Sequence, residues 1–420
     1  MSKKFQAVKG TRDLLPPATA TWSGVEAVAR RVFETYGYKE IRTPLLEDTE
    51  LFVRSVGEST DIVGKEMYSF ADRKGRNLTL RPENTASVVR AFVQHGLQRE
   101  PLPVKFFYIG PQFRYERPQK GRYRQFHQIG AELLGDPGPY SDAELILMLV
   151  RFLGELGFDD LVVQLNTVGD DISRMAYREG LREFLEPHRQ SLSPDSQRRL
   201  DTNPLRILDT KDAVERGLLE TAPQLGDFLT EESRVHFQTV QAVLSRNELA
   251  FRVEPRLVRG LDYYTSTVFE IVSEGLGAQD AIVGGGRYDG LVAELGGQPL
   301  PAIGFAIGED RLVEVLPQVF TSEFGTPAPI TVVTAGNVEG DEALAIAEEL
   351  RGSGLTAIAE LSPRSVKSAM KRAHRSGSRL VVLIGDEEVQ EGTVTVRDLE
   401  SAEQSQISRQ DLVEYVRGIV

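Results

Sequence analysis

The chain has 420 residues, a formal net charge of −13 and no cysteine. The lack of cysteine excludes disulfides and thiolate metal sites, and with five scattered histidines it predicts that zinc is absent. The acidic balance argues against a protein that coats nucleic acid non-specifically, because such affinity comes from phosphate neutralisation. We find no signal peptide and no apolar run of ~20 residues, so we expect a cytoplasmic protein without membrane contact.

The length predicts two to three domains of roughly 100–200 residues each. Hydrophobic spacing predicts, in chain order, helix 22–36, strand 38–44, helix 85–95, strands 104–115 and 124–134, helix 142–157 and strand 161–166. Residues 172–247 are helical and charge-rich, which indicates an inserted module. Strand patterns return at 251–258 and 266–272, and a short helix is expected at 310–316.

A stretch rich in glycine and proline at 319–329 is the expected linker. Beyond it strands and helices alternate at short intervals, which predicts a small α/β domain. Its expected elements are strand 330–333, helix 340–352, strand 356–359, helix 363–375, strands 380–384 and 393–396, and helix 408–419. The predicted domains are therefore 1–325 and 326–420.

An arginine-rich loop joins the two strands expected at 104–115 and 124–134. Because strand side chains alternate between faces, one face of this hairpin is expected to carry Arg114, Glu116, Arg124, Phe126, Gln128, Gly130 and Glu132. Arginine offers a planar fork of donors that fits phosphate oxygens, and phenylalanine can stack on a flat base. The face therefore suits a ligand with a phosphate and a ring. The alternative is a solvated face of ion pairs.

The stretch Phe113–Glu132 resembles motif 2 of class II aminoacyl-tRNA synthetases, in the form found in histidyl-tRNA synthetases. The resemblance implies that Arg114 holds the α-phosphate of ATP, that Phe126 stacks on adenine and that Arg122 reaches the outer phosphates. It also implies that the loop contacts the tRNA acceptor end, with Arg117, Gln119 and Arg124 as the candidate residues.

The stretch Val258–Thr265 is similar to the motif that distinguishes histidyl enzymes within class II. The resemblance implies that Arg259 is catalytic, contacts histidine and lies against the α-phosphate, where related enzymes place a metal ion. A fixed cation there would stabilise the charge that develops in the displacement. Tyr264 would line the imidazole pocket with Glu132. Alternation predicts that one of Tyr263 and Tyr264 is instead packed in the core.

Leu80–Thr85 resembles the loop of the family that binds the α-amino group. By this resemblance Glu83 pairs with the ammonium group, Thr85 accepts a hydrogen bond and Gln128 adds a contact to histidine. Asn84 stands where many members have glycine, and because asparagine tolerates a left-handed backbone better than most residues, we expect the loop to be kept. A helix N-cap at Asn84 or Thr85 is a compatible alternative.

Two glycine-containing segments complete the expected site. Ala302–Leu312 resembles motif 3, a strand that runs into a helix, and implies that Arg311 holds the γ-phosphate. Gly284–Gly290 resembles the glycine-rich turn before it, and Tyr288 would form a wall of the histidine pocket. Glu40–Glu47 resembles motif 1, which implies a homodimer interface; the alternative is simply a buried strand.

In the C-terminal domain the helix expected at 363–375 has one basic face, with Arg364, Lys367, Lys371 and Arg375. Its opposite face, with Val366, Met370 and Ala373, is expected to be buried. The basic face is a candidate RNA contact on the anticodon side; the alternative is a solvated helix face. The domain resembles the anticodon-binding domain of class IIa synthetases.

The resemblance covers nearly the whole chain, and its motifs occur in the order of the family. It implies an α+β catalytic domain with a mainly antiparallel sheet, an inserted helical module and a C-terminal α/β anticodon-binding domain. The implied activity is ATP-dependent ligation of L-histidine to tRNA(His) through histidyl-adenylate, with release of AMP and pyrophosphate. Mg²⁺ is expected with ATP, with no protein side chain assigned to it.

Two alternatives remain for comparison. A regulatory subunit of ATP phosphoribosyltransferase shares the catalytic fold, but it typically lacks the Arg259 motif and the anticodon domain, both of which this chain has. A class II enzyme for threonine or proline is disfavoured by the segment Arg259–Thr265, and zinc-dependent recognition of threonine would lack its cysteine ligand here.

Overall fold

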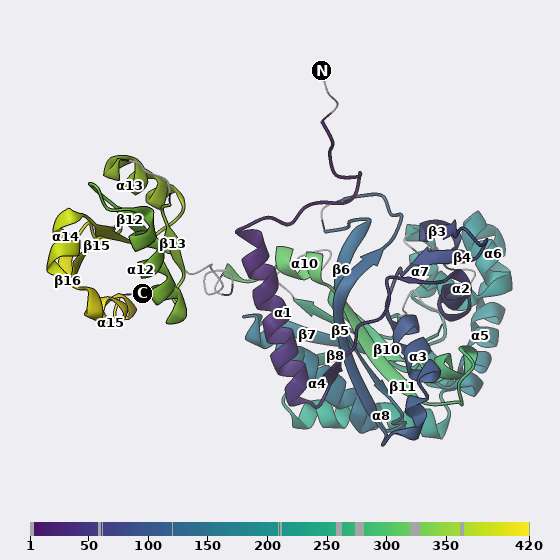
Figure 1. Cartoon of the computed structure of the whole chain (residues 1–420). Coiled ribbons are helices and arrows are strands. Elements are labelled where there is room, and N and C mark those ends of the chain that lie inside the picture. The colour runs from purple at the N-terminus through teal and green to yellow at the C-terminus, as the bar shows by residue number, and fades with distance from the viewer. Residues whose placement is uncertain are drawn as a thin grey trace. The chain divides into compact units, whose positions relative to one another are not determined.

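The computed structural model describes residues 4–57, 60, 62–119, 121–208, 210, 212–257, 263–273, 281–318, 320, 328–361 and 365–419. The chain forms two compact units, Met1–Phe324 and Gly325–Val420 (Figure 1). Among the described residues, no helix is long and apolar enough to cross a membrane.

The first unit is organised around an eight-stranded sheet in the order β1-β5-β6-β11-β10-β9-β7-β8. These strands span β1 Lys39–Glu40, β5 Val104–Phe113, β6 Gln125–Leu134, β7 Leu161–Thr167, β8 Phe251–Val253, β9 Thr265–Ser273, β10 Ala281–Arg287 and β11 Ala302–Gly308. The edge strand β1 pairs in parallel with β5, and the edge strand β8 pairs in parallel with β7. All other neighbouring strands pair antiparallel. The mainly antiparallel sheet predicted from the sequence is confirmed. The strands predicted at 38–44 and 251–258 are shorter than expected.

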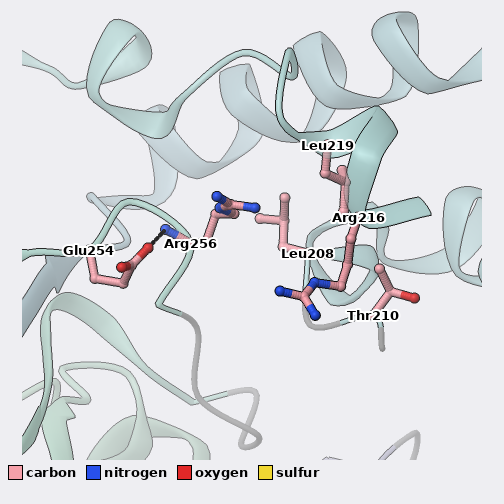
Figure 2. A pocket seen from close by; sticks show the side chains of 6 residues that line it. All are labelled: Leu208, Thr210, Arg216, Leu219, Glu254 and Arg256. Atoms are coloured by element: carbon pink, nitrogen blue, oxygen red, sulfur yellow. Dashed lines mark hydrogen bonds between the residues drawn. The ribbon is translucent and has the colours of Figure 1, made fainter. Parts of the chain in front are cut away.

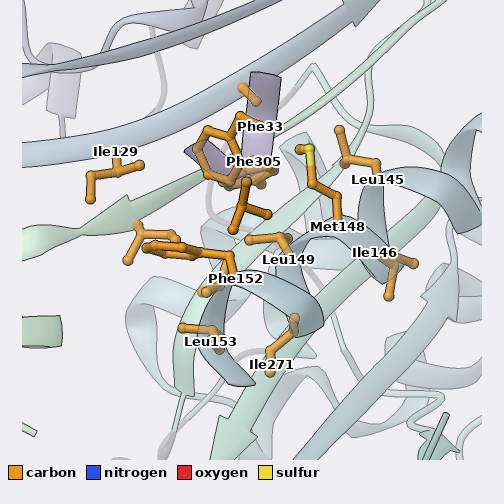
Figure 3. Close-up of a cluster of buried hydrophobic side chains, with 14 of the residues drawn as sticks. Phe33, Ile129, Leu145, Ile146, Met148, Leu149, Phe152, Leu153, Ile271 and Phe305 are labelled. Carbon is orange, nitrogen blue, oxygen red and sulfur yellow. The ribbon is translucent and has the colours of Figure 1, made fainter. Parts of the chain in front are cut away.

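One face of this sheet is covered by helices. The helices are α1 Ala18–Thr35, α4 Pro139–Glu155 and α8 Glu231–Arg246. Phe33 of α1 makes edge-on ring contacts with Phe107, Phe152 and Phe305, at centroid distances of 5.7, 5.4 and 5.8 Å (Figure 3). The odd-numbered residues of β6 point into this core. Its even-numbered residues therefore lie on the opposite face.

Smaller elements surround that opposite face. They are β2 Leu46–Asp48, α2 Thr49–Val56, β3 Tyr68–Ala71, β4 Asn77–Leu80, α3 Thr85–Gln94 and α9 Leu291–Glu294. The three short strands form a separate sheet in the order β2-β4-β3, which sequence spacing did not predict. The first residues of α3 come within hydrogen-bond distance of β6, because Thr85 bonds to Glu132.

The predicted helical insertion is present, and its helices pack into two different apolar cores. Its helices α5 Asp171–Leu185, α6 Pro194–Thr202 and α7 Ala213–Leu219 enclose a small apolar core of their own, which includes Tyr177, Leu181 and Leu200. The last helix, α8, instead contributes Phe237, Val240 and Leu244 to the main core. The insertion is therefore anchored to the sheet by α8.

The second unit has a five-stranded sheet in the order β13-β12-β14-β15-β16. Its elements are β12 Ile330–Thr334, α12 Gly340–Gly352, β13 Ala357–Ala359, α13 Val366–Arg375, β14 Leu380–Ile384, α14 Asp386–Glu391, β15 Thr393–Asp398, β16 Gln404–Ser408 and α15 Leu412–Arg417. The predicted α/β fold is confirmed. The helix expected at 408–419 begins only at Leu412, and β16 and α14 were not predicted.

A buried carboxyl group lies where helix α10 (Glu309–Glu314) packs on α1. Glu309 is fully buried, and neither of its carboxyl oxygens has a hydrogen-bond partner among the described residues. Burial, with the nearby carboxylates of Glu26 and Asp310, raises the pKa of Glu309 from 4.5 to about 9. At neutral pH this side chain is therefore protonated in the folded protein.

The stability of the first unit should depend on this proton. The unfolded chain releases it near pH 4.5 and the folded chain only near pH 9, so the contribution of Glu309 to stability falls as pH rises between these values. Glu309→Gln removes this dependence. We expect the free energy of unfolding of the variant, relative to wild type, to increase by roughly 2–4 kcal/mol from pH 5 to pH 8 in urea unfolding.

Glu314→Gln is the matched control, because Glu314 is exposed on the same helix. Other buried carboxyls contribute equally to both proteins and cancel in the comparison. A stability difference that stays constant with pH would show that Glu309 is ionised in the folded chain.

Candidate active site

Four central strands form a face on which the side chains alternate between polar groups and glycine. Across β5 and β6, Gln112 pairs with Phe126, Gly110 with Gln128 and Tyr108 with Gly130. Across β6 and β11, Glu132 pairs with Gly304. The structure thus brings Phe126, Gln128 and Glu132 onto one face, as the alternation predicted.

The glycines on this face leave room for polar side chains to lie flat on the sheet. A Cβ atom on Gly304 would lie 1.6 Å from Oε2 of Glu132, and one on Gly130 would lie 2.3 Å from the Tyr108 ring. A Cβ on Gly286 would lie 2.8 Å from the ring of Tyr264. These glycines are therefore required for close approach, which is a role of glycine inside strands.

The run Gly284–Gly286 lies within strand β10. The sequence predicted a glycine-rich turn at Gly284–Gly290, and this is wrong for its first half, since Ala281–Arg287 is β10 in the middle of the sheet. The turn follows at Asp289 and Gly290. Glycine is more typical of turns than of strands, which explains the misplacement.

Glu132 lies at the centre of a buried polar cluster. Thr85 donates a hydrogen bond to Oε1 at 2.7 Å and the Tyr288 hydroxyl donates one to Oε2 at 2.5 Å. Burial raises the pKa of Glu132 to about 8, although both hydrogen bonds lower it. A carboxyl group has more hydrogen-bonding positions than these two contacts use, so it can also bind a ligand. The predicted histidine-pocket residues Thr85, Glu132 and Tyr288 are therefore in direct contact.

The alternation predicted for Tyr263 and Tyr264 is not observed, since β9 begins only at Thr265 and the two ring centroids are 4.8 Å apart. Tyr263 is buried, with its ring 5.6 Å from that of Tyr288. Tyr264 is partly buried, lies over Gly286, and its backbone carbonyl accepts a hydrogen bond from Arg174 of the insertion at 2.6 Å. Tyr263 is thus the core residue of the pair.

Glu83 closes the amino-terminal end of α3. Its buried carboxylate accepts hydrogen bonds from the backbone N–H groups of Thr85 (2.6 Å) and Ala86 (3.0 Å), and burial raises its pKa. A left-handed backbone is not used at Asn84, whose φ is −116°. The Asn84 side chain also does not cap α3; its Oδ1 accepts from Arg81 and Thr43 instead.

Two buried amides on this face have polar atoms without a partner among the described residues. They are Oε1 of Gln128 and both side-chain polar atoms of Gln112, which is fully buried. Such atoms cost free energy unless a ligand or water meets them. Gln112 was not predicted as a site residue, although its position two residues before Arg114 places it on the same face.

The predicted phosphate-binding residues lie at the loop end of the β5–β6 hairpin, where residues 114–124 join the two strands. The Arg114 guanidinium lies 5.3 Å from the Phe126 ring and donates to the carbonyl of Pro82 at 2.8 Å. Glu116 lies between two arginines, 3.9 Å from Arg114 and 3.7 Å from the exposed Arg122. The arginines are held by an ion-pair network, yet the same face carries the buried glutamate and amides, which a solvated ion-pair ladder does not need.

The loop residues predicted to contact the acceptor end differ in their surroundings. Arg117 is exposed, and the backbones of Gln119 and Arg122 pair with each other in a tight turn. The Arg124 guanidinium lies 3.8 Å from the centre of the Tyr115 ring, with the side chain against Gly10. Arg311, on the first turns of α10, has its Cβ beside Gly121 of this loop.

The cavity in Figure 2 lies elsewhere in the first unit. It has a volume of about 300 Å³ and is lined by side chains from the insertion and from the segment after β8: Leu208, Thr210, Arg216, Leu219, Glu254 and Arg256. None of these residues belongs to the predicted site. The polar face of the sheet is therefore the better candidate for catalysis.

Comparison with known proteins agrees with this geometry. The family profile described as "Histidyl-tRNA synthetase" matches residues 10–312, and the profile described as "Anticodon binding domain" matches residues 330–419. The chain belongs to the histidyl-tRNA synthetase family. The resemblance found in the sequence motifs is thereby confirmed.

Individual members of the family align with nearly the full chain. A histidine–tRNA ligase from Synechococcus sp. (strain JA-3-3Ab) is 48% identical over 412 residues, which cover 98% of each chain. The crystal structure of apo histidyl-tRNA synthetase from S. aureus is 35% identical, with a TM-score of 0.83, and covers 98% of this chain and 99% of its own. A structure described as an ATP phosphoribosyltransferase regulatory subunit/histidyl-tRNA synthetase from Bacillus halodurans C is 24% identical, with a TM-score of 0.68 and coverage of 92% and 99%, and shares the fold.

Two of the predicted site residues are not placed by the structure. Arg259, with the rest of 258–262, and Arg364, within 362–364, lie outside the described residues. In the second unit of the chain, Lys367, Lys371 and Arg375 are exposed on α13.

The apolar side of that helix differs from the prediction. Val366 is exposed rather than buried, whereas Ala369 and Ala373 are fully buried and Met370 is partly buried. Val366 is the first residue of α13, so the packed stripe begins one turn later than expected.

A substitution at Gly304 tests the histidine pocket of this family member. In Gly304→Ala the new Cβ would overlap Oε2 of Glu132, so the carboxylate must move. We expect the KM for histidine to rise about 10- to 100-fold, since misplacing a contact by an ångström costs that much, with a smaller change in the KM for ATP. Steady-state pyrophosphate exchange measures both constants.

Gly308→Ala on the same strand is the control, because its Cβ would meet nothing within 4 Å. Glu132→Gln, which preserves the shape of the side chain, should also raise the histidine KM selectively. An unchanged histidine KM in both variants would remove Glu132 from the pocket.

Proposed function

We propose that the polar face of the eight-stranded sheet is where this chain activates L-histidine with ATP and transfers it to tRNA(His). The reaction of the family is ATP-dependent ligation through a histidyl-adenylate, with release of AMP and pyrophosphate. The observation that carries the proposal is the buried cluster of Thr85, Glu132 and Tyr288, which lies on the same face as Phe126 and Arg114. An acceptor for a ring N–H therefore lies beside groups suited to a nucleotide.

In the histidine half of the site, Glu132 and Tyr264 bind the imidazole, and Tyr288 closes the pocket. Gln128 contacts the substrate with its buried Oε1, which has no partner among the described residues. Glu83 and Thr85 meet the α-ammonium group. Glu83 is already fixed by two backbone N–H groups, so its orientation does not depend on the ligand.

In the nucleotide half, Phe126 stacks on adenine, Arg114 holds the α-phosphate, and Arg122 and Arg311 reach the outer phosphates. The histidine carboxylate attacks the α-phosphorus, and the bond to pyrophosphate breaks. In the second step the terminal ribose hydroxyl of the tRNA attacks the acyl carbon, and AMP leaves. The protein contributes positioning and charge stabilisation.

Arg259 completes the assignment as the catalytic cation at the α-phosphate. The proposal rests on its sequence motif and on the anchoring of the described residues at either side. Leu257 and Tyr263 are both buried, and the Leu257 carbonyl accepts a hydrogen bond from Asn166 at 3.0 Å.

Mg²⁺ accompanies ATP in this proposal. The ion prefers oxygen ligands and is commonly held by one or two carboxylates together with phosphates and water. When bound, Mg²⁺ would neutralise charge on the outer phosphates. Zinc is not part of the proposal.

In this proposal the tRNA contacts both units of the chain. The protein acts in the cytoplasm. Residues 1–325 carry catalysis, with Arg117, Gln119 and Arg124 at the acceptor end. Residues 326–420 contact the anticodon side, and the exposed Lys367, Lys371 and Arg375 of α13, with Arg364, are the candidates.

Pyrophosphate exchange with one amino acid at a time tests this function. We expect exchange with histidine alone, because the pocket offers a carboxyl and a phenol to a ring with two nitrogens. Arg259→Ala should lower the exchange rate by about 10²–10³, as the loss of a transition-state charge partner does. Exchange with a different amino acid would overturn the pocket assignment.

Arg256→Ala is the matched control, since Arg256 is an exposed arginine three residues before Arg259. Its rate should stay close to that of wild type. Equal losses in both variants would indicate a general effect on the segment rather than a catalytic role of Arg259.

We also propose that the chain is a homodimer through the segment that resembles motif 1. The alternative of a buried strand is not supported, since Leu45 and Leu46 are 42% and 43% exposed. Phe70 of the neighbouring β3 is 48% exposed. Apolar side chains gathered on one small sheet are typical of a protein interface.

Sedimentation analysis tests the dimer. We expect wild type to sediment as a dimer at micromolar concentration and Leu46→Glu to shift toward monomer, because a buried unpaired charge is costly. Leu361→Glu, at an exposed leucine of the second unit, is the control and should remain dimeric. A monomeric wild type would refute the proposal.

A further inference from the structure

We propose that Arg12 is a positioning residue, which fixes the arginine-rich loop 114–124 against α10 so that Arg122 and Arg311 serve the same ATP molecule. The inference rests on the proposed roles of these two arginines. We call the segment Lys9–Arg12 the N-terminal brace.

The backbone of the brace docks on the end of the loop. The N–H of Arg124 donates to the carbonyl of Gly10 at 2.7 Å, and Nη1 of Arg124 donates to the carbonyl of Lys9 at 3.5 Å. Gly10 has a φ of +89°, and a Cβ there would lie 2.7 Å from Cγ and Cδ of Arg124. Only glycine fits this contact without a shift of the loop.

The side chain of Arg12 connects the loop to α10. Its guanidinium lies 4.1 Å from the centre of the Tyr123 ring, and Nη1 donates to the Tyr123 hydroxyl at 3.0 Å. Nη2 donates to Oδ1 of Asp310 at 2.8 Å. One planar fork therefore binds two partners that are far apart in sequence, which lysine cannot reproduce.

Asp310 transmits this contact to the predicted phosphate site. Its side chain is only 5% exposed, and its second oxygen accepts from the backbone N–H of His127 on β6 at 2.7 Å. Arg311 is the next residue on α10, and its Cβ lies beside Gly121 of the loop. Without Arg12 the Asp310 carboxylate would keep the hydrogen bond from the His127 N–H but would lose its link to Tyr123, so α10 would no longer be tied to the loop.

These contacts fix the position of the arginine-rich loop relative to α10. Loop, brace and α10 are held together at three points, at Gly10, Tyr123 and Asp310. Arg12 itself is still one-third exposed, so its contribution to overall stability is small compared with its effect on the position of the loop.

Kinetic constants from pyrophosphate exchange test the proposal. In Arg12→Gln we expect the KM for ATP to rise about 5- to 20-fold, the range of a lost charge-assisted hydrogen bond, with the histidine KM changed less than about twofold. Arg12→Lys, which keeps the charge but not the fork, should recover part of this loss. Lys9→Gln removes a positive charge from the same brace without changing a described side-chain contact, and it should behave as wild type.

Limited trypsin digestion gives a second reading, independent of activity. The loop offers cleavage sites after Arg122 and Arg124, and Arg122 is 57% exposed. We expect cleavage in the loop to be at least fivefold faster in Arg12→Gln than in wild type or Lys9→Gln. Unchanged cleavage together with an unchanged ATP KM would overturn the proposal. Equal rises in both KM values with a lower melting temperature would show a general structural role instead, and would also overturn it.

The same measurements distinguish a failure of the proposed function from a failure of the role proposed for Arg12. If wild type showed no exchange with histidine, the proposed function would fail, while faster loop cleavage in Arg12→Gln would still support the brace. If Arg122→Ala and Arg311→Ala left the ATP KM unchanged, the phosphate assignments would fail, and with them the role of Arg12 in ATP binding.

Discussion

The burial of Glu132 on a sheet face that is lined with glycine is the constraint on which the rest of the site depends. A carboxyl group taken out of water is costly unless it is protonated or hydrogen-bonded. The structure meets this cost in both ways, with donors at Thr85 and Tyr288 and with a pKa of about 8. The cluster in turn requires Gly304 opposite Glu132 and requires α3 to begin at Thr85. Sheet register and helix start are thus coupled through one side chain.

The two ends of the hairpin have different physical character. Away from the loop, around Glu132, the polar groups are buried and hydrogen-bonded to one another. At the loop end, arginines are held by aromatic rings, one glutamate and the N-terminal brace. The first arrangement suits recognition of a small ring that must be distinguished from other amino acids. The second suits a flexible polyanion, because guanidinium groups can exchange one oxygen partner for another.

Much of this could be predicted from the sequence, and the reasons are local. The alternation along 124–134 placed Phe126, Gln128 and Glu132 on one face, and the long pairing of β5 with β6 confirms it. The helices with strong apolar spacing, such as α4, were also found. The family motifs supplied the pocket residues, whose contacts with one another are now visible for Thr85, Glu132 and Tyr288.

What could not be predicted depends on contacts distant in sequence. The glycines of β10 are typical of a turn until Phe269 and Tyr264 are seen to pack against Gly285 and Gly286. The strand β16 alternates between exposed and partly buried residues and has little hydrophobic pattern. Gln112 is notable only once its buried, unpartnered amide is seen. Arg12 could not be linked to the site at all, since its partners are Tyr123 and Asp310.

The separation between Arg12 and Asp310 has a consequence for the order in which the protein is made. The two residues are 298 positions apart, and the ion pair joins nearly the first and the last parts of the catalytic unit. A ribosome that adds 5–20 residues per second reaches Asp310 about 15–60 s after Arg12 has been added. During that interval the brace has no carboxylate to bind. The contact between the arginine-rich loop 114–124 and α10 therefore becomes complete only late in synthesis, when most of the catalytic unit has already emerged.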